Sequence, residues 1–381
     1  MKKIIYLAVC VSILFVGSLR AADVPFVELE GRADEVTEAT FSPDGKKIVA
    51  ATGNIVRIWD TDSESTTFGK ELQKLELEGE ILGNSAVFGK IVTKTEDNVF
   101  HVWDANGRKL RTLNPGDDFV ECGVSPGGTR IVTVYGDYRI RLWDTESGKE
   151  VRVSPRTPSL VQRAAGRRTV QALARQGITA WAVPGYAYFS PNGKKIVAMD
   201  PELANLAVQI YDAQSGRGLQ ILEGRNPTLS PNGNRVVMTS MLDYTIAQLW
   251  NTETGNRIAN IKSADGPIVF SPDDGRFMVM QSGDVNSNTV LVFDTNSGAQ
   301  LRKLNLKDPD EQTVALSSDG RRIVTENYSE EITRIVDATN GNELQKLEGR
   351  FLDFARDNRK IATISDDTIR VWTLPTAVGS R

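Results

Sequence analysis

Eight short apolar segments of this 381-residue chain end on one pattern, an aromatic or aliphatic residue followed by Asp or a substitute for it. The endings are RIWD (57–60), HVWD (101–104), RLWD (141–144), QIYD (209–212), QLWN (248–251), LVFD (291–294), RIVD (334–337) and RVWT (370–373). Their third positions, from Trp59 to Trp372, lie 44, 40, 68, 39, 43, 43 and 36 residues apart. A period of about 40–45 residues that closes on Trp-Asp is typical of one blade of a β-propeller. The repeat therefore restricts the fold more than any other feature of the chain.

Each repeat also has the chemistry of strands joined by tight turns. In the first repeat a strand ends at Ser42, and Pro43-Asp44-Gly45 forms a turn because Pro presets φ and Gly accepts positive φ. Related turns follow at Val124-Ser-Pro-Gly-Gly, Phe189-Ser-Pro-Asn-Gly, Leu229-Ser-Pro-Asn-Gly, Phe270-Ser-Pro-Asp-Asp-Gly and Leu316-Ser-Ser-Asp-Gly. Hairpin turns such as Thr145-Glu-Ser-Gly-Lys follow the endings. Helical periodicity is almost absent, so the sequence predicts an all-β protein.

The turn and the Trp-Asp ending recur in phase over nearly all of 24–374, and in this the chain resembles the WD-repeat (G-protein β-like) propeller family. The resemblance implies that each repeat supplies three strands of one blade and the outer strand of the next. It also implies that the first strand closes the ring on the last repeat. Pro25–Glu30 has the sequence of an outer strand, and the last repeat lacks one of its own, so we expect Pro25–Glu30 to complete it. The predicted fold is all-β, an eight-bladed β-propeller of four-stranded antiparallel blades closed by the N-terminal strand.

The 68-residue gap between Trp143 and Tyr211 makes the number of blades ambiguous, and seven or nine blades are less favoured than eight. Trp181 resembles the Trp of a ninth repeat, but it lies only 30 residues before Tyr211, which is too short for a blade. We therefore expect a basic insertion at about 152–185 in an eight-bladed ring.

The chain departs from the family pattern at the start of each blade. Many family members carry a Gly-His pair there, whose His is linked through Ser or Thr to the Trp. Here the matching positions read Gly31-Arg32, Gly79-Glu80, Gly224-Arg225 and Gly349-Arg350. We expect the buried hydrogen-bond network to be missing or replaced, with stability supplied by strand pairing and apolar packing.

Residues 1–22 have the features of a secretory signal peptide. Lys2-Lys3 is followed by a predominantly apolar stretch of sixteen residues from Ile4 to Leu19 and by Ala21-Ala22. We expect an exported protein, periplasmic or extracellular, whose residues 23–381 form a single propeller domain without an integral membrane segment. An uncleaved membrane anchor is the alternative. Loss of residues 1–22 would change the net charge from −4 to −7, and this acidic balance does not suggest nucleic-acid binding.

The sequence offers little catalytic chemistry. Its single His, His101, and the one Cys left after cleavage, Cys122, cannot build a zinc site. No nucleophile elbow accompanies His101, and the blade motif of quinone-dependent propellers lacks its Trp after Gly148. We predict no catalytic residues, no metal and no cofactor, and we interpret Cys122 as a small core residue.

Two groups of Arg are candidates for binding a partner. The resemblance implies that Arg32, Arg225 and Arg350 lie in loops that join an outer strand to the next inner strand on one rim of the ring. Pointing inward there, they would form a partial cationic ring that suits carboxylates or phosphates. Alternatively, they pair with acidic neighbours. Residues 151–185 contain six Arg and no Asp or Glu, and a flap with Arg156, Arg163, Arg167 and Arg168 would dock on an acidic partner or merely cover a seam between blades.

These observations favour a monomeric, non-catalytic scaffold for protein–protein interaction. The alternative is a propeller enzyme, or a module that binds carbohydrate or small anions through carboxylates and Arg at the channel mouth. A structural stabiliser of a larger envelope complex is a third hypothesis. A fold of this kind does not by itself fix function.

Overall fold

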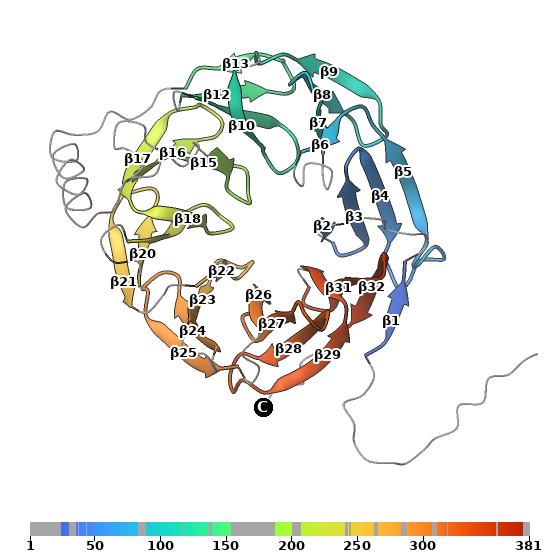
Figure 1. Ribbon diagram of the computed structural model, residues 1–381, viewed down its shortest axis with the longest axis vertical. Coiled ribbons are helices and arrows are strands. Elements are labelled where there is room, and N and C mark those ends of the chain that lie inside the picture. Colours follow the sequence, from blue (N-terminus) through green and yellow to red (C-terminus); the bar gives the residue numbers. More distant parts are fainter. Residues whose placement is uncertain are drawn as a thin grey trace, which may run out of the picture.

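The computed structural model describes residues 24–29, 36, 38–42, 44–82, 89–116, 118–136, 139–153, 187–199, 207–240, 243, 245–262, 266–282, 288–306, 311–317, 319–355 and 357–375. These residues form eight four-stranded antiparallel sheets arranged as the blades of a ring (Figure 1). In each blade the first strand of the repeat lies toward the centre of the ring and the fourth lies at its outside (Figure 1). The predicted all-β, eight-bladed propeller is confirmed.

The first four blades follow the chain in order. Blade 1 consists of β2 (Glu38–Phe41), β3 (Lys47–Thr52), β4 (Ile55–Asp60) and β5 (Glu71–Glu76), and blade 2 of β6 (Glu80–Ile81), β7 (Ile91–Lys94), β8 (Phe100–Trp103) and β9 (Lys109–Leu113). Blade 3 consists of β10 (Phe119–Val124), β11 (Arg130–Tyr135), β12 (Ile140–Asp144) and β13 (Glu150–Val151), and blade 4 of β14 (Ala187–Phe189), β15 (Lys195–Met199), β16 (Ala207–Asp212) and β17 (Gly218–Glu223).

The other four blades complete the ring. Blade 5 consists of β18 (Arg225–Leu229), β19 (Arg235–Thr239), β20 (Ile246–Asn251) and β21 (Arg257–Lys262), and blade 6 of β22 (Ile268–Phe270), β23 (Arg276–Ser282), β24 (Asn288–Asp294) and β25 (Gln300–Asn305). Blade 7 consists of β26 (Gln312–Leu316), β27 (Arg322–Asn327), β28 (Ile332–Asp337) and β29 (Glu343–Glu348). Blade 8 consists of β30 (Arg350–Phe354), β31 (Lys360–Ser365), β32 (Thr368–Thr373) and the N-terminal strand β1 (Phe26–Glu28).

Strand β1 closes the ring as the sequence predicts. Val27 pairs with Val371, and the Phe26 ring lies 4.5 Å from the Trp372 ring between centroids. Arg370 holds Glu28 with a 3.0 Å ion pair. This pairing covers the edge that β32 would otherwise expose.

The hydrophobic core is divided among the interfaces between blades. A separate cluster of buried side chains lies at each of the eight interfaces, such as the one in which Phe41, Ile48 and Trp59 of blade 1 pack with Ile364 and Val371 of blade 8. Each sheet therefore buries apolar side chains on both faces, which is why second strands such as β3 and β15 have nearly continuous apolar sequences, whereas outer strands such as β5 alternate.

The Ser of the recurrent turn fixes the inner hairpin of six blades. In blade 1 the Lys47 amide donates to Ser42 Oγ at 2.8 Å, and the Ser42 hydroxyl donates to Asp44 at 2.5 Å. Equivalent contacts are made by Ser125, Ser190, Ser230, Ser271 and Ser317. Because the hydroxyl satisfies an amide at the turn, a Ser is useful at this position, although blade 8 has Ala355 there.

The network that the missing His would complete is replaced rather than lost. The indole of Trp372 donates to Thr363 Oγ at 2.8 Å, and the Thr363 hydroxyl donates to the Glu348 carbonyl at 2.7 Å. Trp103 and Thr93 form the same chain to the Glu78 carbonyl. A backbone carbonyl thus accepts the hydrogen bond that a His would accept in the WD-repeat family that the sequence resembles.

His101 of β8 pairs with Thr112 of the neighbouring strand β9. It is buried, with Nδ1 3.0 Å from Thr112 Oγ and Nε2 3.4 Å from Glu78. Cys122 is half-buried and packs against the cluster between blades 2 and 3, and burial raises its pKa to about 11. A thiol with this pKa is protonated at neutral pH and is a poor nucleophile.

Candidate functional site

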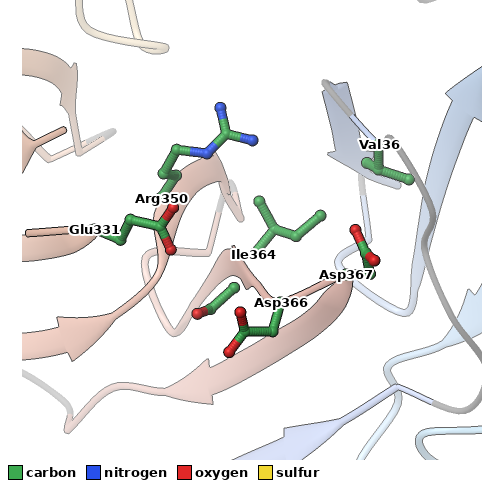
Figure 2. Close-up of a pocket in the computed structure, with 7 residues that line it drawn as sticks. Val36, Glu331, Arg350, Ile364, Asp366 and Asp367 are labelled. Carbon is green, nitrogen blue, oxygen red and sulfur yellow. The ribbon is translucent and has the colours of Figure 1, made fainter. Parts of the chain in front are cut away.

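A pocket of about 330 Å³ opens where blades 7, 8 and 1 meet at one rim of the ring. Figure 2 shows the side chains that line it. They are Val36, Glu331, Arg350, Ile364, Ser365, Asp366 and Asp367. Val36 precedes β2 of blade 1, Glu331 ends the β27–β28 hairpin of blade 7, and the other five belong to blade 8. The pocket therefore exists only in the closed ring.

Two tight turns present the acidic side chains. Asp366 and Asp367 form the two-residue turn between β31 and β32, with φ of 48° and 59°, and Ser365 pairs with Thr368 across it. Positive φ at both central residues is the type I′ geometry that suits the twist of a hairpin. Glu331 has φ 51°, which is uncommon for a Glu. Three of the seven described non-Gly residues with positive φ thus line this one pocket, and such backbone is often found at functional sites.

Gly349 fixes the start of β30 and with it the place of Arg350. Its amide donates to the Glu331 carbonyl at 2.7 Å, and its carbonyl accepts from Thr333 at 2.8 Å. A Cβ at Gly349 would lie 2.7 Å from the Ile364 carbonyl oxygen, and φ there is 95°. Only Gly allows this approach, which explains why Gly precedes the Arg.

Arg350 projects from the pocket and has no ion pair within the described residues. The alternative that it pairs with acidic loop neighbours is therefore not what the described residues show. Its charge acts on Glu326, a buried side chain of β27. Burial raises the pKa of Glu326, and the Phe351 amide and Arg350 partly counter that effect.

Tyr328 supplies an exposed aromatic surface next to the pocket. It lies in the same hairpin as Glu331 and is 51% exposed. Burial of its hydroxyl end and the neighbouring Glu326 raise its pKa, so the phenol stays protonated at neutral pH. An exposed Tyr beside an exposed Arg is the combination that carries much of the binding energy at protein interfaces.

The predicted binding residues do not all fall in this pocket. Arg350 lines it, whereas Arg225 is half-buried at the start of β18 in blade 5 and is not part of its lining. Arg32, Arg156, Arg163, Arg167 and Arg168 lie outside the described residues, as do the predicted signal segment and most of the predicted insertion.

The acidic lining was missed by sequence reasoning. Glu330-Glu331 and Asp366-Asp367 are acidic pairs at the equivalent hairpin of two consecutive repeats, and this coincidence was the available signal. Within the ranges that the structure describes, no three His, Cys, Asp or Glu side chains gather closely enough to hold one metal ion. None of the described elements is a helix of the length and hydropathy that a membrane span requires.

Comparison with known proteins agrees with the geometry. Residues 24–60 match the model of the WD domain, G-beta repeat. The chain is a WD-repeat β-propeller. This propeller is 23% identical over 268 residues to the WD repeat-containing protein WDS homolog of Arabidopsis thaliana, an alignment that covers 61% of the chain and 50% of that protein. It is 29% identical over 144 residues to the Angio-associated migratory cell protein of Homo sapiens, with 36% and 31% covered. The propeller thus spans half or less of the length of these curated relatives.

Two solved structures share the fold of the WD-repeat propeller. The C-terminal WD40 domain of Sif2 aligns with a TM-score of 0.58 and 14% identity, covering 92% of this chain and 100% of that one. BamB from Moraxella catarrhalis aligns with a TM-score of 0.54 and 14% identity, covering 92% and 99%. At this identity the likeness concerns the fold alone.

Proposed function

We propose that this WD-repeat propeller is a non-catalytic platform that binds a protein partner at the rim pocket between blades 7, 8 and 1. A WD-repeat propeller generally suggests a protein-interaction scaffold. The observation that supports this place is the gathering of charges without an ion pair around one hollow that three blades build, with Tyr328 exposed in the hairpin that carries Glu331. The signal-like residues 1–22 support an exported location for this activity.

The charges of the pocket make it a poor site for small anions, the alternative that the sequence left open. Arg350 is accompanied by three carboxylates, those of Glu331, Asp366 and Asp367. A phosphate or carboxylate ligand would meet repulsion from all three as well as attraction to the guanidinium. A polypeptide surface with charges of both signs suits this lining better.

Site-specific photo-crosslinking in the native cells tests the platform. A photoreactive phenylalanine analogue replaces Tyr328 in the full chain, and a matched chain carries it at Leu72, which is 43% exposed on β5 at the outside of blade 1. We expect a discrete protein adduct from position 328 and none from position 72. Adducts at both positions, or at neither, would contradict a docking site at this rim.

Cell fractionation tests the exported location. Full-length protein carrying a C-terminal tag should be recovered outside the cytoplasm, with a new N-terminus after Ala21 or Ala22. Recovery of uncleaved chain with the cytoplasmic fraction would contradict export but would leave the crosslinking result to be judged separately.

A further inference from the structure

Resting on that proposed function, we infer that the rim pocket receives one basic side chain, Lys or Arg, of the protein partner. The inference concerns the chemistry of the occupant, and it depends on the shape of the pocket lining, on the charges of the lining and on the hydroxyl of Ser365.

The floor of the pocket is aliphatic. Ile364 and Val36 are 5% and 4% exposed and line it from blade 8 and from the entry to blade 1. Figure 2 shows Ile364 in the middle of the pocket with Glu331, Asp366 and Asp367 around it. Lys and Arg place apolar methylenes on such a surface while their charged ends remain near polar groups.

The surrounding charges favour a cation. Glu331, Asp366 and Asp367 give the lining three negative charges, against one positive charge on Arg350. None of the three carboxylates has an ion pair within the described ranges. An arriving ammonium or guanidinium would therefore not have to displace a cation of the protein itself. The acidic balance of the whole chain, −4, also favours the approach of a basic partner.

Ser365 adds a neutral acceptor to the lining. It is 8% exposed and lines the pocket, and no hydrogen bond of its hydroxyl lies within the described part of the chain. An ammonium or guanidinium in the pocket would donate to this oxygen as well as to the carboxylates.

The arrangement fits an extended organic cation better than a metal ion. Among the described side chains no group of three acidic or other ligating residues is close enough to bind one ion, so the carboxylates are distributed around the hollow. A chain several atoms long can contact the aliphatic floor and reach carboxylates from two blades at once.

Methyl NMR of the full chain tests this directly. The Ile δ1 methyl groups are labelled, and the Ile364 resonance is assigned from its loss in Ile364→Val. The protein is titrated with N-acetyl-lysine methylamide and N-acetyl-arginine methylamide, with the neutral N-acetyl-norleucine methylamide and CaCl₂ as comparisons. We expect a saturable shift of Ile364 with at least one basic probe, in the millimolar range, and none with norleucine.

Two variants separate charge from shape. Asp366→Asn/Asp367→Asn keeps side chains that accept positive φ and should weaken binding of the basic probe about fivefold or more. Arg350→Ala removes a like charge and should strengthen it by about twofold to fivefold. Unchanged Ile resonances at other blade interfaces, such as Ile91 between blades 1 and 2, report an intact fold in both variants.

Several results would overturn the inference. These are the absence of a saturable shift, an equal shift with norleucine, a shift produced by CaCl₂ alone, or binding that the two Asn substitutions leave unchanged. A crosslink at position 328 together with a failed titration would retain the platform and reject the basic occupant. A successful titration without a crosslink would reject the platform at this rim.

Discussion

Gly349 shows how one residue without a side chain positions a charged neighbour. Its amide and carbonyl bond to the β27–β28 hairpin region of blade 7, while its Cα lies against β31 of blade 8. The backbone can approach Ile364 this closely only because no Cβ intervenes. Arg350 therefore starts β30 at the mouth of the pocket.

Replacement of this glycine should cost more than replacement of a turn glycine. Gly349→Ala should lower the free energy of unfolding by about 3 kcal/mol, since Ala adds a clash with the Ile364 carbonyl to unfavourable backbone. Gly53→Ala is the matched control, because Gly53 has φ 55° and nothing within 4 Å of its Cβ position, and it should cost about 1 kcal/mol. Urea unfolding measures both, and equal losses would show that the close approach is unimportant.

Glu326 should make stability depend on pH in the direction opposite to that of most carboxyls. Burial raises its pKa above the ordinary value of 4.5, so the folded chain holds this proton more tightly than the unfolded chain. The resulting stabilisation is complete below pH 4.5 and is lost as pH rises through the folded-state pKa. Glu326→Gln abolishes the loss because Gln stays neutral.

The free energy of unfolding of Glu326→Gln relative to wild type should therefore increase between pH 4.5 and pH 7.5, as measured by urea unfolding at intervals of one pH unit. Glu64→Gln, at an exposed turn of blade 1, is the comparison for removing a solvated charge. If the free-energy difference between Glu326→Gln and wild type stays constant or declines with pH, burial is not the main influence on the pKa of Glu326.

At the scale of elements, a cation near the start of the second strand links most blades to the next. Six blades have such a contact: Lys90 to Glu146, Lys195 to Thr252 and Glu253, Arg235 to Asn296, Arg276 to the Asp319 carbonyl, Arg322 to the Asn358 and Pro375 carbonyls, and Lys360 to the Gly45 and Thr61 carbonyls. These contacts lie beside the turns of the recurrent Ser. These polar contacts make the packing between neighbouring blades more specific, because the carbonyls and carboxylates of one blade reach the cation of the other only when the two blades are correctly aligned.

Lys360 is the contact to test, since it joins the last blade to the first. Its Nζ donates to the Gly45 and Thr61 carbonyls at 3.0 and 2.6 Å. Lys360→Met keeps the stem but leaves both carbonyls without this donor, and should lower the free energy of unfolding by about 1–3 kcal/mol. Lys47→Met changes the exposed Lys at the equivalent position of blade 1 and should have an effect below about 0.5 kcal/mol. Similar effects of the two substitutions in urea unfolding would contradict a role for the contact.

At the scale of the whole molecule, three ordered residues decide whether the ring is closed. Strand β1 is short, but it covers the edge of β32 and places Phe26 against Trp372. Val24, which precedes it, packs in the cluster between blades 7 and 8. The pocket needs this closure, because its lining comes from both sides of the seam.

A chain that begins at Gly31 should lose closure. We expect a lower melting temperature and association in size-exclusion chromatography, since the exposed edge of β32 pairs with other chains. A peptide of residues 23–30 added in excess should restore a monomer and raise the melting temperature. A truncated chain that melts like the full one and stays monomeric would show that closure by β1 is dispensable.

The fold was predictable because its signals are local and repeated. Each Ser-Pro-Asp-Gly turn and each Trp-Asp ending marks a hairpin whose geometry depends on residues within a few positions. The outer-strand sequence of Pro25–Glu30 likewise predicted its pairing with the last repeat, and Val27 does pair with Val371. The replaced hydrogen-bond chain was predictable only as a missing His, since the substitute acceptor is a backbone carbonyl, at Glu348 in blade 8.

Only one residue of the candidate site, Arg350, was predicted from the sequence, because it follows Gly349 at the start of a blade. Glu331 and Asp366 lie 35 residues apart in sequence, and Val36 is nearly 300 residues from Glu331. No local pattern states that these side chains surround one hollow, and the acidic neighbours that the sequence offered for the Arg residues did not include Glu331 or Asp366.

The sequence by itself determined the architecture, because turns, apolar strands and their period are properties of neighbouring residues that hold in every repeat. The tertiary structure alone decided which side chains share the seam, because the first and last blades meet only when the ring closes. Closure brings Val36 beside blade 8 and sets Arg350 and Ser365 beside three carboxylates. The net charge around that hollow comes from residues that are distant in the chain. Its effect on a bound group depends on distances that only packing fixes.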